Sequence, residues 1–195
     1  MPRLNEKNVE QAKSIIKRYP RSRSALIPLL HLAQEQDGWV APEAMEHIAE
    51  LLDLAPAEVL GTCSFYEMFK REPVGKYVVN VCTNISCQLL GGEELLARCE
   101  QALGIRAGST TPDGLVTLEE VECIAACTEA PALQVNYRYF HKVSDAYAEE
   151  LLRDLRAGLL DGEIPPHGIT TRVRQSIPVD RWYGRGAEGL PAEVK

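Results

Sequence analysis

Four of the six cysteines in this 195-residue chain form two close pairs. The stretch NVCTNISC contains Cys82 and Cys87, and the stretch CIAAC contains Cys123 and Cys127. The spacings are C-x4-C and C-x3-C, and 35 residues separate the pairs. Cysteine thiolates bind zinc and iron, and a close pair of thiols can also exchange electrons. The two pairs therefore indicate one site with metal-binding or redox chemistry.

Four interpretations of these paired thiols compete. Zinc sites commonly use C-x2-C knuckles in small domains that need the metal to fold, and neither pair has that spacing. A thioredoxin-type dithiol requires C-x-x-C at a helix N-terminus, and the sequence contains no such pair. A 2Fe-2S cluster takes two thiolates per iron and accepts wider pairs such as C-x4-C. In the fourth interpretation the thiols bind nothing and pack as small apolar side chains.

The remaining candidate ligands are scattered. Cys63 and Cys99 are expected to pack in the interior as small apolar residues. The histidines have no metal-ligand spacing such as H-E-x-x-H, so core or surface roles are sufficient for them: His31, His47, His141 and His167. No general acid, base or nucleophile is evident, and no catalytic residue is predicted.

Composition limits the classes of protein to which the chain can belong. It is 45% hydrophobic and 25% charged, which is typical of a globular protein. The net charge of −7 argues against a nucleic-acid partner, so the basic run KRYPRSR is interpreted as a solvated connection. No apolar stretch approaches the ~18 residues of a membrane span, and no signal peptide is visible, so a soluble cytoplasmic protein is expected. Cysteine pairs in that reducing compartment favour metal binding or redox chemistry over disulfides.

The first 74 residues are expected to form a small antiparallel helical module. Helical periodicity covers residues 8–18 and 24–36, and a third helix begins at Ala41-Pro42. Ala55-Pro56 begins a fourth helix, again with proline in the first turn. Short helices with breakers between them are typical of such a module.

Residues 75–160 are expected to form a second domain with the order β-α-β-β-α. The expected strands are Lys76–Val81, 115–123 and Ala132–Phe140, and the expected helices are Gly92–Ile105 and Asp145–Arg156, the last one capped by Ser144. Each cysteine pair begins where a strand ends, and a strand end followed by a tight loop presents thiolates and free backbone N–H groups together. The Pro- and Gly-containing residues 161–195 are expected to form an extended C-terminal tail.

Four stretches resemble one known family, the small thioredoxin-like 2Fe-2S ferredoxin subunit of respiratory NADH:quinone oxidoreductase (the 24 kDa subunit family of complex I). They are RSALIPLLHLAQEQDGWV, SFYEMF, PVGKYVVNVCTNISC and TPDGLVTLEEVECIAACTEAPALQVN. The resemblance runs from about Tyr19 to Leu155 and implies an α+β fold, a helical bundle followed by a thioredoxin-like ferredoxin domain. It also implies cluster ligands at Cys82, Cys87, Cys123 and Cys127. One departure is Ala125, where the family usually has glycine.

The resemblance further implies an electron-transfer subunit that is not catalytic alone. It would carry one 2Fe-2S cluster per chain, while FMN and the NADH site belong to a partner flavoprotein subunit. The sequence agrees, because its one G-x-G-x-x-G match, Gly184–Gly189, neither follows a strand nor begins a helix. The implied location is the inner face of the cell membrane, held there through the complex without membrane insertion.

Two other functions are kept open. Related subunits serve as the diaphorase part of NAD-linked hydrogenases and formate dehydrogenases. A zinc-stabilised interaction module without a redox role is the other alternative.

Overall fold

The structure is a computed structural model, and it describes residues 3–164 and 167–168 of the chain. These residues divide into two compact units. The first unit comprises residues 3–74 with His167 and Gly168, and the second comprises residues 75–164. Most of the expected tail at 161–195, including the Gly184–Gly189 stretch, lies outside the described residues.

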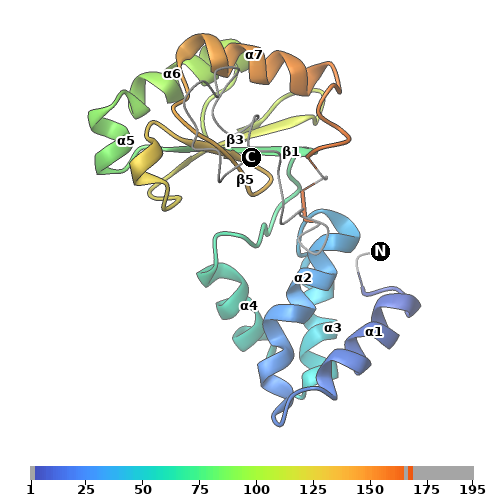
Figure 1. Cartoon of the computed structure of the whole chain (residues 1–195). Coiled ribbons are helices and arrows are strands. Elements are labelled where there is room, and N and C mark those ends of the chain that lie inside the picture. The colour runs from blue at the N-terminus through green and yellow to red at the C-terminus, as the bar shows by residue number, and fades with distance from the viewer. Residues whose placement is uncertain (1–2, 165–166, 169–195) are drawn as a thin grey trace, which may run out of the picture. The chain divides into compact units, whose positions relative to one another are not determined.

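The first unit is helical (Figure 1). It contains α1 (Glu6–Ile16), the 3-10 helix η1 (Ser22–Ala25), α2 (Leu26–Asp37), α3 (Pro42–Leu52) and α4 (Pro56–Phe65). Asn5 caps α1 by accepting a hydrogen bond from the Asn8 N–H, and Pro42 and Pro56 begin their helices as the sequence predicts. The expected helix at 24–36 is wrong at its start, because a 3-10 turn precedes α2.

The core of the first unit also holds the segment that follows α4. Phe69 is buried and packs against the His31 ring, with ring centroids 4.8 Å apart. The buried Gln34 side chain holds this segment, donating to the Met68 carbonyl and accepting from the Lys70 N–H, both at 2.7 Å. Phe65, in contrast, is 77% exposed. The aromatic stretch after residue 64 therefore contributes to the core through Phe69 and to the surface through Phe65.

The second unit is a five-stranded mixed sheet with helices. Its elements are β1 (Tyr77–Cys82), α5 (Ile85–Leu89), α6 (Gly92–Leu103), β2 (Ser109–Thr110), β3 (Val116–Val121), η2 (Cys127–Glu129), β4 (Leu133–Val135), β5 (Arg138–Phe140) and α7 (Asp145–Arg156). The strand order is β2-β3-β1-β4-β5; β1 and β3 are parallel and the other neighbours are antiparallel. Helices α6 and α7 cover one face of the sheet (Figure 1).

Alternation along β1 builds the core on the helical face of the sheet. Tyr77, Val79 and Val81 point to the same face and are fully buried with apolar residues of α6 and α7. Ser144 caps α7, as predicted, by accepting from the Tyr147 N–H. Ile164 belongs to the same core, and Asp161 accepts hydrogen bonds from Tyr77 and Lys76, so the packed unit extends to residue 164.

The expected single strand at 132–140 is wrong, because β4 and β5 form a hairpin there. Asn136 and Tyr137 join the strands with φ angles of 47° and 69°, the left-handed pair that a tight two-residue turn requires. The Asn136 side chain fixes this turn against β1, accepting from the Val78 N–H and donating to the Lys76 carbonyl, both at 2.8 Å. The two-residue strand β2 and the short helix α5 were not predicted from the sequence either.

Across the described residues, no helix combines the length and the apolar character that crossing a membrane requires.

Candidate functional site

The parallel pairing of β1 and β3 brings both cysteine pairs to one edge of the sheet. Cys82, the last residue of β1, is in register with Val121, the last residue of β3, and Cys123 follows two positions later. The Thr83 N–H extends this pairing past the strand by donating to the Val121 carbonyl at 3.1 Å. Because parallel strands end at the same edge, the two loops that carry the thiols leave the sheet together.

The first pair is buried. Cys82 and Cys87 are 4% and 3% exposed, and they pack with Ile124, Ala130 and Ala132 in a small apolar cluster of their own. Cys87 lies on α5, a helix that begins where the Asn84 side chain accepts from the Ile85 N–H at 2.7 Å. The loop that follows β1 therefore places Cys87 next to Cys82.

Gly92 permits this close packing. It is the first residue of α6, and a Cβ atom there would lie 2.8 Å from the Cys82 carbonyl oxygen and 2.9 Å from the Cys87 carbonyl group. Real Cβ atoms do not approach backbone atoms so closely. Glycine is thus required for α6 to pack directly against the backbone of the Cys82–Cys87 loop.

The second pair lies on an exposed loop. Cys123 and Cys127 are both exposed, whereas Ile124 between them is buried. Ala125 has φ 60°, in the left-handed region that favours glycine, and its N–H donates to the Cys123 sulfur at 3.3 Å. The positive φ is a physical reason for glycine at this position in the family that the sequence resembles.

Burial controls the acidity of several thiols. It is the main cause that raises the pKa of Cys87 to about 11, and the neighbouring Cys82 thiol raises it further. Burial also raises the pKa of Cys99 to about 12 and that of Cys63 above its usual value. Cys63 and Cys99 are fully buried, as expected for packing residues. A metal ion bound to a thiol of this kind, with its positive charge, can hold it ionised at neutral pH.

The four paired thiols are on one edge of the sheet but do not form a closed ligand set. Cys82 and Cys87 pack in one apolar cluster, and both Cys82 and Cys127 lie near enough to raise the pKa of Cys87. Nowhere in the described part of the chain are three or more His, Cys, Asp or Glu side chains grouped closely enough to hold a metal ion. Soft sulfur donors on two adjacent loops, the second of which carries the small residues Ala125 and Ala126, nevertheless fit an iron-sulfur cluster in their donor chemistry.

Two features of the site were not predicted from the sequence. The helix α5 was signalled by Asn84, a residue favoured at the N-cap, but five residues are too few for a detectable periodicity. The Tyr139 hydroxyl donates to the Ile124 carbonyl at 2.8 Å, between the two cysteines of the second loop. No sequence signal indicates this contact, because it depends on the hairpin that brings β5 back to the sheet.

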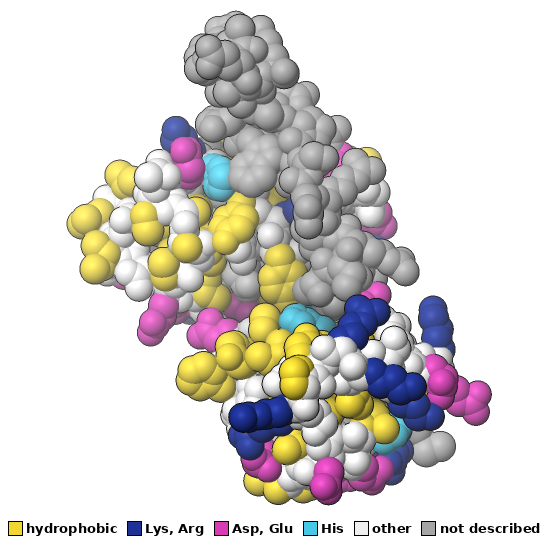
Figure 2. Space-filling model, turned by 60° about the horizontal axis from the view of Figure 1, so that its bottom comes forward, with side chains coloured by type: hydrophobic (Ala, Val, Ile, Leu, Met, Phe, Trp, Pro, Cys, Tyr) yellow, Lys and Arg dark blue, Asp and Glu magenta, His cyan; other side chains and the backbone are white. Residues whose placement is uncertain are grey.

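Exposed apolar side chains adjoin the buried pair. Ile85, Leu89 and Leu90, at α5, are 70%, 79% and 59% exposed. Figure 2 shows hydrophobic side chains gathered on the surface at the end of the second unit where α5 lies. Contiguous apolar surface of this kind often marks a site of contact with another protein.

Comparisons with known proteins agree with one another. The family model described as thioredoxin-like [2Fe-2S] ferredoxin matches residues 12–156. A subunit of NADH-quinone oxidoreductase from Mycobacterium bovis is 40% identical over 188 residues, which is 92% of this chain and 74% of the relative. Subunit 2 of NADH-quinone oxidoreductase from Thermus thermophilus is 45% identical over 137 residues, which is 70% of this chain and 76% of the relative.

Among solved structures, the chain resembles part of an NAD+-reducing [NiFe]-hydrogenase in the air-oxidized state. The TM-score is 0.64 and the identity 23%, over 72% of this chain and 24% of that one. The chain thus spans about a quarter of the length of the hydrogenase chain, and the likeness concerns the fold alone.

Proposed function

Because the chain belongs to the thioredoxin-like 2Fe-2S ferredoxin family, in the group that includes these NADH-quinone oxidoreductase subunits, we propose that its paired cysteines hold one 2Fe-2S cluster per chain. The chain is an electron-transfer subunit of NADH-quinone oxidoreductase, a multi-subunit enzyme. Its α+β fold, with helices followed by a thioredoxin-like domain, is the fold that the sequence predicts. The proposed ligands are Cys82, Cys87, Cys123 and Cys127. The observation that carries this assignment is the register of β1 with β3, which directs both pairs to one edge.

The chain's own residues would hold and shield the group. When bound, the cluster supplies reversible one-electron transfer. Cys82 and Cys87 would hold it from the buried side, where Ile124 and Ala132 exclude water. Cys123 and Cys127 would hold it from the exposed loop. The Ala125 N–H, which already donates to the Cys123 sulfur, would offset part of the negative charge on that ligand.

We propose that a flavoprotein subunit of the same complex, carrying FMN and the NADH site, is the electron-exchange partner. Two features of the second unit support such a docking partner. The second pair of thiols is exposed, so electrons can enter and leave on that side, and exposed apolar side chains of α5 lie beside the first pair. The working location would then be the inner face of the cell membrane, reached through the complex.

A diaphorase subunit of an NAD-linked hydrogenase or formate dehydrogenase is the second candidate within the same chemistry. The fold likeness to the hydrogenase favours it only at the level of architecture, because the identity is 23%. Identities of 40% and 45% to NADH-quinone oxidoreductase subunits favour the first candidate.

The purified chain alone is expected not to oxidise NADH, and electron transfer from NADH to its cluster is expected only after the flavoprotein subunit is added. The physical reason is that hydride removal requires a flavin and a dinucleotide site, which the partner would supply. The measurement is NADH-dependent reduction of the cluster, followed by its electron paramagnetic resonance signal, with dithionite reduction as the positive control. NADH oxidation by this chain alone would refute the proposal that the flavoprotein subunit carries the NADH site.

A further inference from the structure

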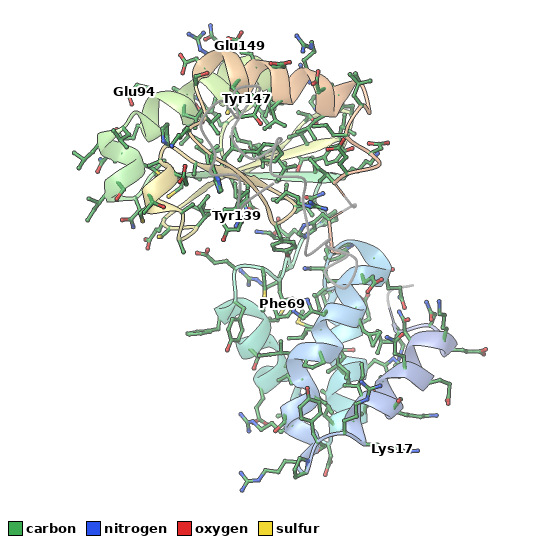
Figure 3. The ribbon with its side chains drawn as sticks, viewed as in Figure 1. Lys17, Phe69, Glu94, Tyr139, Tyr147 and Glu149 are labelled. Carbon is green, nitrogen blue, oxygen red and sulfur yellow. The ribbon has the colours of Figure 1, made fainter. Side chains whose placement is uncertain are left out.

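Tyr139 lies on the face of the sheet opposite α6 and α7. Successive residues of a strand point to opposite faces. Phe140 points to the helical side and packs near Tyr147 of α7, with ring centroids 6.4 Å apart, whereas Tyr139 packs with the apolar cluster around Cys82 and Cys87. Figure 3 shows the two labelled tyrosines on either side of the sheet. Tyr139 is therefore directed toward the candidate ligands and Tyr147 away from them.

The Tyr139 hydroxyl holds one peptide unit of the second ligand loop. It donates to the Ile124 carbonyl oxygen at 2.8 Å, and the N–H of Ala125 belongs to the same peptide unit. Peptide units are planar, so fixing the direction of the carbonyl also fixes the direction of the N–H. That N–H donates to the Cys123 sulfur at 3.3 Å. The hydrogen bond from the Tyr139 hydroxyl thus fixes the direction of the hydrogen bond from the Ala125 N–H to Cys123, a candidate ligand.

The loop has a conformational cost that this hydrogen bond helps to offset. Ala125 has φ 60°, which is unfavourable for a residue with a Cβ atom. The segment beyond Cys127 is held from the connection between β5 and α7, where the Lys142 N–H donates to the Glu129 carbonyl at 2.8 Å and the Val143 N–H to the Pro131 carbonyl at 2.9 Å. Tyr139 contacts the second ligand loop between its two cysteines.

We propose that Tyr139 is a positioning residue for the cluster, which directs the Ala125 N–H at the Cys123 sulfur and thereby raises the reduction potential. This inference rests on the proposed function, because Cys123 must be a ligand. A reduced cluster carries one more negative charge than an oxidised one, and N–H donors to its sulfur ligands favour the reduced state. Without the hydroxyl the peptide unit is free to turn, and part of that preference is lost.

The test is Tyr139→Phe in the full chain, with Tyr147→Phe as the matched control. Both changes remove only a hydroxyl from a half-buried ring in the second unit. Tyr139→Phe is expected to bind iron and sulfide as the wild type does but to lower the equilibrium constant for one-electron reduction about two- to tenfold, the range of one ordinary hydrogen bond. Tenfold corresponds to about 59 mV in a potentiometric titration followed by electron paramagnetic resonance. Tyr147→Phe is expected to leave the potential unchanged.

The outcomes separate this inference from the function on which it rests. A wild-type chain without iron and sulfide would overturn both. A wild-type chain with its cluster, and a Tyr139→Phe variant of unchanged potential, would overturn the role of Tyr139 alone. If the variant purifies without cluster, amide hydrogen exchange in the cluster-free chain decides: faster exchange at Ala125 in the variant than in cluster-free wild type supports the role, and equal exchange overturns it.

Discussion

Serine in place of any one of Cys82, Cys87, Cys123 or Cys127 is expected to abolish or strongly reduce 2Fe-2S binding. Serine is nearly the same size as cysteine, but its hydroxyl stays protonated where a thiol ionises, and its oxygen is a much harder donor than sulfur. A cluster that needs four thiolates is then left with an open iron position. The measurement is iron and acid-labile sulfide per chain, together with the visible absorption of each anaerobically purified variant.

Cys63→Ala and Cys99→Ala are the matched controls for these four variants. Both side chains are fully buried in apolar cores, so their loss is expected to cost roughly 1 kcal/mol of unfolding free energy and to leave the cluster intact. Full cluster content in one of the four paired-cysteine variants would remove that residue from the ligand set. Loss of the cluster in Cys99→Ala would show that destabilising the second unit is enough to lose the cluster. Cluster loss in the serine variants would then be no evidence that the replaced cysteines are ligands.

Alanine at Gly92 is expected to destabilise the second unit and to lower its cluster content. The added Cβ atom would lie 2.8–2.9 Å from backbone atoms of Cys82 and Cys87, and backbone atoms cannot turn aside as a side chain can. Either α6 or the ligand loop must move, at a cost of roughly 1–3 kcal/mol. Urea unfolding followed by a signal from the second unit measures the free-energy change, and iron analysis measures the cluster content.

Gly61→Ala separates the effect of crowding from the general effect of adding a methyl group to a helical glycine. Gly61 lies inside α4, and a Cβ atom there would meet nothing within 4 Å. This change is expected to raise the unfolding free energy of the first unit by roughly 0.5–1 kcal/mol, because alanine favours the helix over glycine. If Gly92→Ala matched wild type in both stability and cluster content, close packing of α6 on the ligand loop would not be needed.

Local signals in the sequence were sufficient for most of the fold. Prolines at the first positions of α3 and α4, the Ser144 cap of α7 and the apolar strand β1 all act through neighbouring residues, and their elements are where the sequence predicts them. The β4–β5 hairpin was missed for a physical reason. Its turn residues, Asn136 and Tyr137, are stabilised in left-handed conformations by hydrogen bonds from the Asn136 side chain to β1 and to Lys76 just before it, which are distant in the sequence.

Some features of the candidate site could also be predicted from the sequence, and others could not. That each cysteine pair begins near the end of a strand could be predicted from residue types alone, and in the structure Cys82 is the last residue of β1 while Cys123 follows β3 by two positions. The glycine contact at Gly92 and the hydrogen bond from Tyr139 could not, because each depends on atoms that tertiary packing brings together. The assignment of the four thiols as cluster ligands stays a prediction.

Metal and sulfide analysis of the anaerobically purified full chain tests the central claim most directly. The proposed function predicts about two irons and two acid-labile sulfides per chain, with an electron paramagnetic resonance signal that develops on one-electron reduction. Stoichiometric zinc without sulfide, in a colourless protein, would contradict it and would favour the zinc-stabilised interaction module.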